Sequence, residues 1–299
     1  MPELPEVEVV RAGLEPVLRG ATIRKVDIRD PRSLRRHLGS PADFARALTG
    51  RRVEEVVRRG KFLWCTLEGD QALVGHLGMS GQMLIGPPDS DFGAHLRVRF
   101  DIDDPAGSPL SVGFVDQRIF GSLMIDSLVP TPDGKPGGAG TTRPLVPQSA
   151  AHIARDPLDP AFDEAAWVRA LRTKRTGIKR ALLDQELISG VGNIYADEAL
   201  WASKLHYDTP AERIAPARAR QLLAAIREVF VRALAEGGTS FDSQYVNVNG
   251  QSGYFSRSLH AYGKDGQPCE RCGSIIVRER FMNRSSYRCP RCQKRPATR

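Results

Sequence analysis

Apolar residues near the start of the chain recur with the period of a helix. One face of this helix would carry Val7, Val10, Leu14 and Leu18. Pro5 suits the first helical turn, because a residue there has no intrahelical partner for an N–H group. We expect the helix to end at Gly20. The pattern therefore predicts an N-terminal helix with one buried face.

From about residue 21 to residue 126 the pattern changes to that of strands. Between residues 96 and 102, apolar side chains alternate with Arg97, Arg99 and Asp101, as in a strand buried on one side. Similar runs occur at 53–58, 61–67 and 110–115. An antiparallel β-sandwich that carries the N-terminal helix fits this pattern best, and we assign it to residues 1–128.

Residues 129–147 contain five prolines, four glycines and few apolar side chains. That composition is typical of a linker, which we place at residues 129–157. It would separate the sandwich from the remainder of the chain.

Beyond this segment the hydrophobic period becomes helical. Asp163 can cap one helix. Further helices are predicted at 178–187, from near Asn193, and from Pro216 to about Ala235. The polar and aromatic stretch 239–262 is expected to be a long mobile loop. We assign residues 158–262 to this helical region and 263–299 to a C-terminal module, so that the fold class is multi-domain α+β.

Composition and charge narrow the class of protein. The 299 residues are 41% hydrophobic and 26% charged, which is ordinary for a globular protein, and two or three domains are expected. No secretory signal or apolar run long enough to cross a membrane is seen, so a cytoplasmic protein is expected. The net charge of +8 favours a polyanionic partner, and residues 264–299 contribute most of it. A solvated basic tail is the alternative.

Four cysteines lie in two pairs within this basic region. They are Cys269, Cys272, Cys289 and Cys292. Two-residue spacings on either side of 16 intervening residues predict a hairpin held by one structural Zn²⁺, with no position open for catalysis. In a reducing compartment these thiols would bind metal rather than form disulfides. Cys65 is expected to be a buried strand residue.

The first residues offer a possible nucleophile. Loss of Met1 would expose the secondary amine of Pro2 beside two carboxylates. A terminal amine titrates near about 7.7–8.0, well below the value of about 10.4 for lysine, so a useful fraction is neutral at pH 7. Such an amine can condense with a sugar C1′ to a cationic iminium. The alternative is that Met-Pro is merely how the chain begins.

Two further residues suit proton transfer. Glu3 adjoins the amine and could act as general acid or base, or simply favour the helix dipole, a role that fits Glu6 better. Lys61 follows two arginines in a chain with 35 Arg and only 8 Lys. Lysine can exchange protons where arginine cannot, although an ordinary exposed lysine is the alternative.

A glycine-containing turn at 187–198 joins two predicted helices. Free N–H groups at the start of the second helix would suit a phosphate. Asn193 is there either an ordinary N-cap or a direct phosphate donor.

Several motifs occur together and in one order along the chain. They are Pro2-Glu3-Leu4-Pro5-Glu6-Val7-Glu8, His76-Leu77-Gly78-Met79-Ser80-Gly81, Asp116-Gln117-Arg118-Ile119-Phe120-Gly121, the 190–198 run, and Asn283-Arg284-Ser285-Ser286 before Cys289. In these motifs the chain resembles the bacterial formamidopyrimidine-DNA glycosylases nearly end to end. The resemblance implies an N-terminal β-sandwich, a helix–two-turn–helix region and a C-terminal zinc finger.

The resemblance also implies an activity and its residues. A member of this family is a bifunctional DNA glycosylase and AP lyase of base excision repair, which removes 8-oxoguanine and formamidopyrimidines and cuts the strand by β,δ-elimination. Pro2 would attack C1′ and Glu3 would donate a proton. Lys61 matches the proton donor of β-elimination, and Arg284 matches the residue assigned to δ-elimination.

The resemblance further implies that the protein is a monomer, needs no organic cofactor and binds damaged double-stranded DNA. DNA-contacting positions of the family match His76, His95, Arg118, Lys174 and Asn193. The residues that fill the gap left by the extruded nucleotide match Met79, Arg118 and Phe120. The loop near 240–255 would cover the extruded base. Ile119 departs from the family, because many members carry a second arginine there, and His95 lacks the lysine that often precedes it.

Two other readings remain open. The related endonuclease VIII family, which acts on oxidised pyrimidines, usually has glycine where Leu4 stands here. A zinc-containing protein that binds nucleic acid without catalysis would need the basic module but not Pro2.

Overall fold

The computed structural model describes residues 2–239, 248–249 and 255–296. It divides into two units, one formed by residues up to His152 together with 237–253, the other by Ile153–Glu236 together with the chain from Tyr254 onward. Among the described residues, no helix combines the length and the apolar character needed to cross a membrane.

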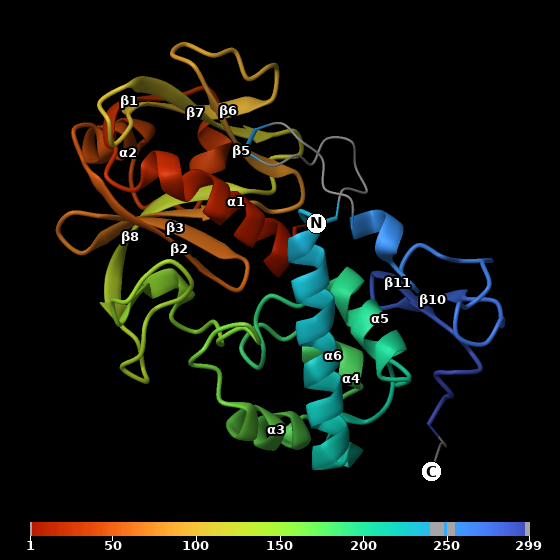
Figure 1. The fold of residues 1–299 in the computed structure, drawn as a ribbon. Coiled ribbons are helices and arrows are strands. Elements are labelled where there is room, and N and C mark those ends of the chain that lie inside the picture. Colours follow the sequence, from red (N-terminus) through yellow and green to blue (C-terminus); the bar gives the residue numbers. More distant parts are fainter. Residues whose placement is uncertain (1, 240–247, 250–254, 297–299) are drawn as a thin grey trace. The chain divides into compact units, whose positions relative to one another are not determined.

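The first unit is the predicted β-sandwich with its N-terminal helix (Figure 1). One sheet has the order β1-β6-β7-β5, with β1 (Thr22–Ile28), β5 (Gly81–Gly86), β6 (Leu96–Asp103) and β7 (Pro109–Asp116). The other has the order β2-β3-β4-β8-β9, with β2 (Val53–Arg59), β3 (Phe62–Leu67), β4 (Gln71–His76), β8 (Ser122–Pro130) and β9 (Leu145–Pro147). All strand pairs are antiparallel.

Helix α1 (Leu4–Leu18) covers one side of this unit and packs against β2. Its buried face contains Val7, Val10 and Leu14, as the periodicity predicts, and joins a core shared by both sheets. Cys65 is buried in β3, also as predicted. The helix is therefore fixed to the sandwich by apolar burial.

A second helix lies where only strands are expected. Helix α2 (Pro41–Leu48) buries Phe44 and Leu48. It begins with a capping box, in which the Asp43 N–H donates to Ser40 Oγ and the Ser40 N–H donates to the Asp43 carboxylate, each at 3.1 Å. Local capping and two apolar contacts thus specify a helix within a strand-rich region.

The expected linker at 129–157 needs correction for most of its length. Val129 and Pro130 pair with Val146 and Leu145 to complete the second sheet. The loop between them lies against β2, where Arg58 and Ala139 exchange two backbone hydrogen bonds of 3.0 and 2.9 Å. A Cβ atom on Gly138 would meet the Arg58 carbonyl oxygen at 2.2 Å, so glycine here allows close packing rather than flexibility.

The second unit is helical and ends in a short hairpin. Its helices are α3 (Glu164–Thr173), α4 (Ile178–Leu182), α5 (Asn193–Ala202) and α6 (Pro216–Ala235), followed by strands β10 (Val277–Phe281) and β11 (Arg284–Arg288). Helix α6 has the predicted bounds, and the Asp163 side chain caps α3 by accepting from the Ala166 N–H at 2.8 Å. Short 3-10 turns occur in both units, at Pro31–Leu34 and Gln148–Ala150 in the first and at Ala211–Arg213 and Phe255–Ser258 in the second.

Two expectations for this unit change. The helix predicted at 178–187 stops at Leu182, after which Asp184 Oδ1 accepts from the Glu186 N–H in a turn. The loop predicted at 239–262 lies largely outside the described residues, at 240–247 and 250–254. Its final part is held by α5, because the Glu198 carboxylate accepts from three consecutive backbone N–H groups, those of His260, Ala261 and Tyr262.

Candidate functional site

The four paired cysteines converge at one point beside the β10–β11 hairpin. The sulfur atoms of Cys269, Cys272, Cys289 and Cys292 all lie within 4.8 Å of one another. Hydrogen bonds from Ser274, the largest cause, lower the pKa of Cys272 to about 6, whereas burial raises the pKa of Cys289 to about 12 and also raises that of Cys292. A bound metal would hold all four as thiolates. Four thiolates fit one structural Zn²⁺ and leave no position for substrate, as the spacing predicts.

Helix α5 is bound directly to this zinc hairpin. The Trp201 indole N–H donates to Cys269 Sγ at 3.4 Å, and Arg271 stacks on the indole ring at 4.0 Å. One turn earlier in the helix, Asp197 accepts from Ser286 Oγ at 2.7 Å and from the Tyr287 N–H at 2.9 Å. Figure 1 shows α5 beside the two strands.

Asn193 and Arg284 are brought together by this arrangement. Asn193 Nδ2 donates to the Ser285 carbonyl at 3.0 Å, and Arg284 is the exposed residue immediately before Ser285. Asn193 is the first helical residue of α5 and Gly192 occupies the cap position, so the N-cap role considered for Asn193 is not observed. Lys174 lies at the end of α3 and pairs with Asp184 at 2.7 Å.

In the first unit, the residues before α1 are buried and fixed. Pro2 and Glu3 are both buried, and Glu3 is the N-cap. The Glu3 N–H donates to Glu6 Oε2 at 2.8 Å, while Glu6 Oε1 accepts from the N–H and Oγ1 of Thr239 at 2.8 and 2.9 Å. Glu6 thus supports the backbone, and the Glu3 side chain completes a capping box by accepting from the Glu6 N–H.

Lys61 lies in the tight turn between β2 and β3. The turn depends on Gly60, which has a φ of 57°, in the left-handed region that favours glycine. The guanidinium of Arg58 donates to the Gly60 carbonyl at 3.1 Å and pairs with Glu8 of α1 at 2.6 Å. The turn that carries Lys61 and the helix that follows Pro2 are therefore connected through one buried cation.

His76, at the end of β4, is held as a neutral imidazole. Burial, the largest cause, and the nearby charges of Arg36, Lys61 and Arg35 lower the pKa of His76 to about 4. Its Nδ1 accepts from the Gly78 N–H at 3.1 Å, and its ring packs edge-on against Phe62. A neutral ring with Nδ1 as acceptor carries its proton on Nε2, which can then donate to a phosphate oxygen.

Two exposed apolar side chains stand on adjacent turns. Met79 is 44% exposed and Phe120 is 53% exposed. A Cβ atom on Gly78 would lie 2.4 Å from the carbonyl carbon of Phe120, so the two turns are in direct backbone contact. Arg118 is exposed in the second turn. The sequence motifs that contain these residues are thus parts of one surface.

Buried Asp116 holds these two turns together. Its carboxylate accepts from Ser80 Oγ at 2.5 Å, the Gly121 N–H at 2.7 Å and the Arg118 N–H at 3.3 Å. The Asp116 N–H in turn donates to the carbonyl of His95, whose side chain is exposed. Asp116 opens one of the ordered sequence motifs, and that position is the only sign of its structural role in the sequence.

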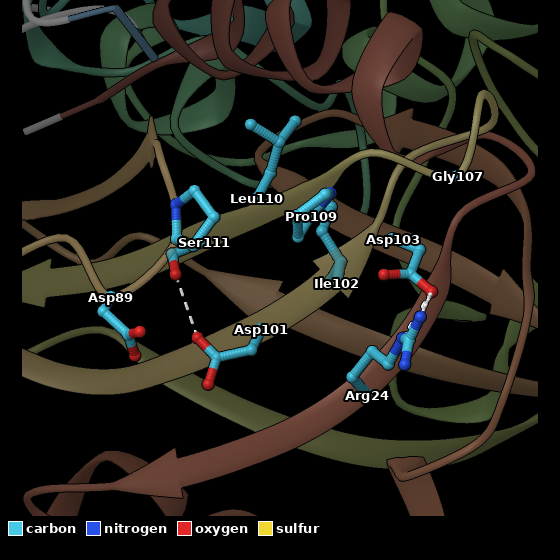
Figure 2. A pocket seen from close by; sticks show the side chains of 10 residues that line it. Arg24, Asp89, Asp101, Ile102, Asp103, Gly107, Pro109, Leu110 and Ser111 are labelled. Atoms are coloured by element: carbon cyan, nitrogen blue, oxygen red, sulfur yellow. Dashed lines mark hydrogen bonds and ion pairs between the residues drawn. The ribbon is translucent and has the colours of Figure 1, made fainter.

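A pocket of about 320 Å³ on the first sheet is a different kind of site (Figure 2). Asp89, Asp101 and Asp103 line it, with Arg24 paired to Asp103 and Ser111 donating to Asp101 at 2.9 Å. Three carboxylates would repel a phosphate backbone, and the described lining includes no predicted site residue. The pocket is therefore separate from the candidate site.

The helix-capped β-sandwich, the helical unit and its zinc hairpin match, in this order, the three domains of a class of zinc-finger DNA glycosylases. Three family models cover most of the chain in this order: the formamidopyrimidine-DNA glycosylase N-terminal domain at residues 1–123, its H2TH domain at 153–244, and the zinc finger found in FPG and IleRS at 266–295.

Curated relatives and solved structures agree with these matches. The formamidopyrimidine-DNA glycosylase of Leifsonia xyli subsp. xyli is 60% identical, over 98% of this chain and 100% of that protein. The enzyme of the same name from Thermobifida fusca is 58% identical, over 99% and 98%. A Lactococcus lactis Fpg in complex with DNA that contains an abasic site has 28% identity and a TM-score of 0.81, over 98% of this chain and 100% of that one. A MutM complex with DNA containing carbocyclic 8-oxo-G has 29% identity and a TM-score of 0.80, over the same shares.

The chain belongs to the formamidopyrimidine-DNA glycosylase family. This confirms the resemblance drawn from the ordered motifs, together with the predicted fold class and the structural zinc site.

Proposed function

We propose that this protein is a bifunctional DNA glycosylase and AP lyase that excises oxidised purines, 8-oxoguanine and formamidopyrimidines, from double-stranded DNA. The observation that carries the proposal is the place of Pro2. It lies immediately before the N-cap of α1, next to the buried Glu3 carboxyl group. DNA with an abasic site or with carbocyclic 8-oxo-G is bound by the similar solved proteins, which supports this class of substrate.

The first step is glycosidic cleavage. The target nucleotide leaves the stack, because C1′ cannot be reached inside the duplex. The Pro2 nitrogen, once Met1 has been removed, forms a bond to C1′ while the bond from C1′ to the base breaks. The electron pair leaves with the base, which takes up the proton that the Pro2 nitrogen releases. Glu3 supplies the proton that opens the sugar ring at O4′, and a cationic iminium between Pro2 and the sugar remains.

Strand cleavage follows from the iminium. It acidifies the C2′ proton, and loss of that proton expels the 3′ phosphate, with Lys61 as the proton donor of this β-elimination. A second, δ-elimination expels the 5′ phosphate, and we assign this step to Arg284. We assign phosphate contacts to His76 and Asn193, and other DNA contacts to His95, Arg118 and Lys174. The space left by the nucleotide is assigned to Met79, Arg118 and Phe120. The protein would act as a cytoplasmic monomer without an organic cofactor.

Borohydride trapping on an 8-oxoguanine duplex tests the nucleophile. Reduction of the iminium leaves a stable covalent protein–DNA adduct, so wild-type protein with processed Met1 should be trapped. Pro2→Gly should greatly reduce trapping while it leaves the affinity for a duplex with an abasic-site analogue nearly unchanged. Pro5→Ala, in the first turn of the same helix, is the matched control and should be trapped normally.

Two outcomes would contradict the proposal. Trapping of Pro2→Gly at the wild-type rate would mean that another amine is the nucleophile. Absence of any adduct with processed wild-type protein would leave a protein that only binds DNA. Mass spectrometry of the first residue establishes the processing state in each preparation.

A further inference from the structure

Ile119 has a backbone conformation that branched side chains rarely adopt. Its φ is 54°, in the left-handed region, where a β-branched residue is a genuine outlier. Such a conformation is strained and persists only where the surrounding contacts hold it in place. Ile119 lies between the exposed residues Arg118 and Phe120, so the strain is located in the turn at 118–121 that carries both.

The carbonyl groups of this turn converge on one distant side chain, Arg35. Arg35 NH1 donates to the carbonyls of Gly121 at 2.6 Å and Ile119 at 3.1 Å, and NH2 donates to that of Phe120 at 2.7 Å. Arg35 directly follows the 3-10 turn at Pro31–Leu34, in the same unit. Charged hydrogen bonds are stronger than neutral ones, and three consecutive carbonyls are held by a single planar cation.

The amide groups of the same turn are held from within the sandwich. The N–H groups of Arg118 and Gly121 donate to the Asp116 carboxylate, which is fully buried. The backbone is thus fixed on two sides by opposite charges, its amides by Asp116 and its carbonyls by Arg35. This arrangement accounts for the persistence of the left-handed Ile119.

We propose that Arg35 is a positioning residue for nucleotide extrusion, because it holds the 118–121 turn in its strained form with Arg118 and Phe120 already projecting. The inference rests on the proposed function. Unstacking one nucleotide is unfavourable, and side chains inserted into the duplex offset part of that cost. If the turn is already ordered before DNA binds, none of the binding free energy is used to order it.

The chemistry of the contact predicts a graded series of variants. Lysine has a single ammonium group and cannot reproduce the planar fork of donors that guanidinium presents. Arg35→Lys should therefore lose part of the effect and Arg35→Ala all of it. Arg36→Ala is the matched control, because it removes the same charge one residue further along and leaves the three Arg35 hydrogen bonds in place.

The test compares substrates that differ in the cost of extrusion. Single-turnover excision of 8-oxoguanine by Arg35→Ala should be slowed most in a duplex with a well-paired lesion, and less where the lesion lies opposite an abasic position. Borohydride trapping on a single-stranded abasic oligonucleotide, which requires no extrusion, should match wild type. Equal excision by wild type and Arg35→Ala on every duplex, or an equal loss on every substrate, would overturn the proposal.

Loss of trapping on the single strand by wild-type protein would instead count against the proposed nucleophile, so the two failures are distinguishable.

A second variant separates positioning from a direct contact between Arg35 and phosphate. Asparagine tolerates the left-handed conformation far better than isoleucine does. Ile119→Asn should therefore restore part of the excision rate in the Arg35→Ala background. A double variant no faster than Arg35→Ala would mean that strain in this turn is not what Arg35 offsets.

Discussion

The buried Arg58 and the partly buried Glu8 form an ion pair that joins β2 to the N-terminal helix. Arg58 Nε lies 2.6 Å from Glu8 Oε2, and the arginine side chain is only 4% exposed. The same guanidinium donates to the carbonyl of Gly60, the residue before Lys61. One cation therefore fixes the helix that begins after Pro2 relative to the turn that carries the proposed proton donor.

Removal of this cation should be costly. Arg58→Met leaves Glu8 partly buried with Arg11 as its remaining partner, at 2.8 Å. Loss of one member of a buried pair typically costs about 3–5 kcal/mol, and we expect the lower end of that range here because Arg11 stays. The measurement is the urea midpoint of the zinc-loaded protein.

Arg29→Met provides the control for the Arg58 variant. Arg29 also pairs with a carboxylate, that of Asp27, but its side chain is 57% exposed. Exposed pairs contribute at most about 1 kcal/mol, so this midpoint should shift little. Equal shifts for the two variants would refute the role of burial.

Lys179 and Asp197 form a second buried pair, 2.7 Å apart, within the helical unit. Burial, the largest cause, raises the pKa of Asp197 to about 6 although Lys179 opposes it. Lys179→Met should destabilise the protein by about 3–5 kcal/mol at pH 8, because an unpaired carboxylate is left buried. A native pKa above the ordinary 3.8 means that the native state holds the proton more firmly. Stability is therefore lost as the pH rises through that pKa and regained as it falls.

The Lys179 prediction is checked by thermal unfolding of Lys179→Met between pH 5 and pH 8. Its melting temperature relative to wild type should recover toward pH 5. The double variant Lys179→Met, Asp197→Asn has no carboxylate to protonate and should lack that recovery. A deficit that does not depend on pH in the single variant would contradict the argument.

The sequence predicted those features whose signals are local. Helix α6 has its predicted bounds because Pro216 begins it and its apolar period is unbroken to Ala235. The zinc site follows from cysteine spacing alone. Helix α2 was missed, because its eight residues are too few for a clear period and its signal is the capping box of Ser40 and Asp43.

Contacts between distant segments could not be predicted in this way. Arg35 and the carbonyls it holds are 84 to 86 residues apart, and no periodicity encodes such a pairing. The Pro and Gly content of the segment after β8 predicts a linker, because such a composition is usual in linkers. Those glycines instead permit backbone contact with β2, a reason that only the neighbouring strand reveals.

The neutral state of His76 predicts a pH dependence of stability. The native pKa of about 4 lies below the ordinary value of 6.5. Between these values the unfolded chain takes up a proton that the native ring does not, so stability is lost as the pH falls through this window. NMR titration should find His76 unprotonated at pH 5.5. In His76→Gln, the urea midpoint should depend less on pH over this window than it does in the wild type.

Lys61→Met gives a test of the cause. The ammonium group of Lys61 contributes to the lowered pKa of His76, so its removal should raise that pKa. A native His76 that titrates at its ordinary value, or one that Lys61→Met leaves unchanged, would contradict the assigned electrostatics.

Loss of the metal should alter DNA binding through Arg284. Cys289→Ser removes one of four thiolates, and the hairpin that carries Arg284 depends on the metal for its fold. We expect lower affinity for an abasic-site duplex and a shallower dependence on salt, because fewer phosphate charges are neutralised. Fluorescence anisotropy over a series of KCl concentrations, with zinc content measured in parallel, provides the test.

Cys65→Ala is the control for the zinc variant, since it also removes a buried thiol but not a metal ligand. It should keep its zinc, its affinity and its salt slope. If Cys289→Ser binds DNA with the wild-type affinity and slope, the zinc hairpin does not position the basic residues.

The contact between Gly78 and Phe120 can be tested with a single methyl group. In Gly78→Ala, the new Cβ atom would lie 2.4 Å from the Phe120 carbonyl carbon, so one of the two turns must move. The left-handed φ of 64° adds a cost of about 1–2 kcal/mol for a residue with a side chain. We expect lower stability and slower excision from duplex DNA, since Met79 and Phe120 lose their relative positions.

Gly134→Ala isolates the steric part of this effect. Gly134 has the same φ of 64°, but the space around its Cβ position is open to 4 Å. Its alanine variant bears the conformational cost alone, so it should be the more stable of the two and should excise 8-oxoguanine at the wild-type rate. Urea midpoints and single-turnover rates measured side by side decide the matter. Indistinguishable variants would mean that the backbone contact between the two turns does not constrain them, because any difference between the alanines arises from the atoms of Phe120 and Gly121.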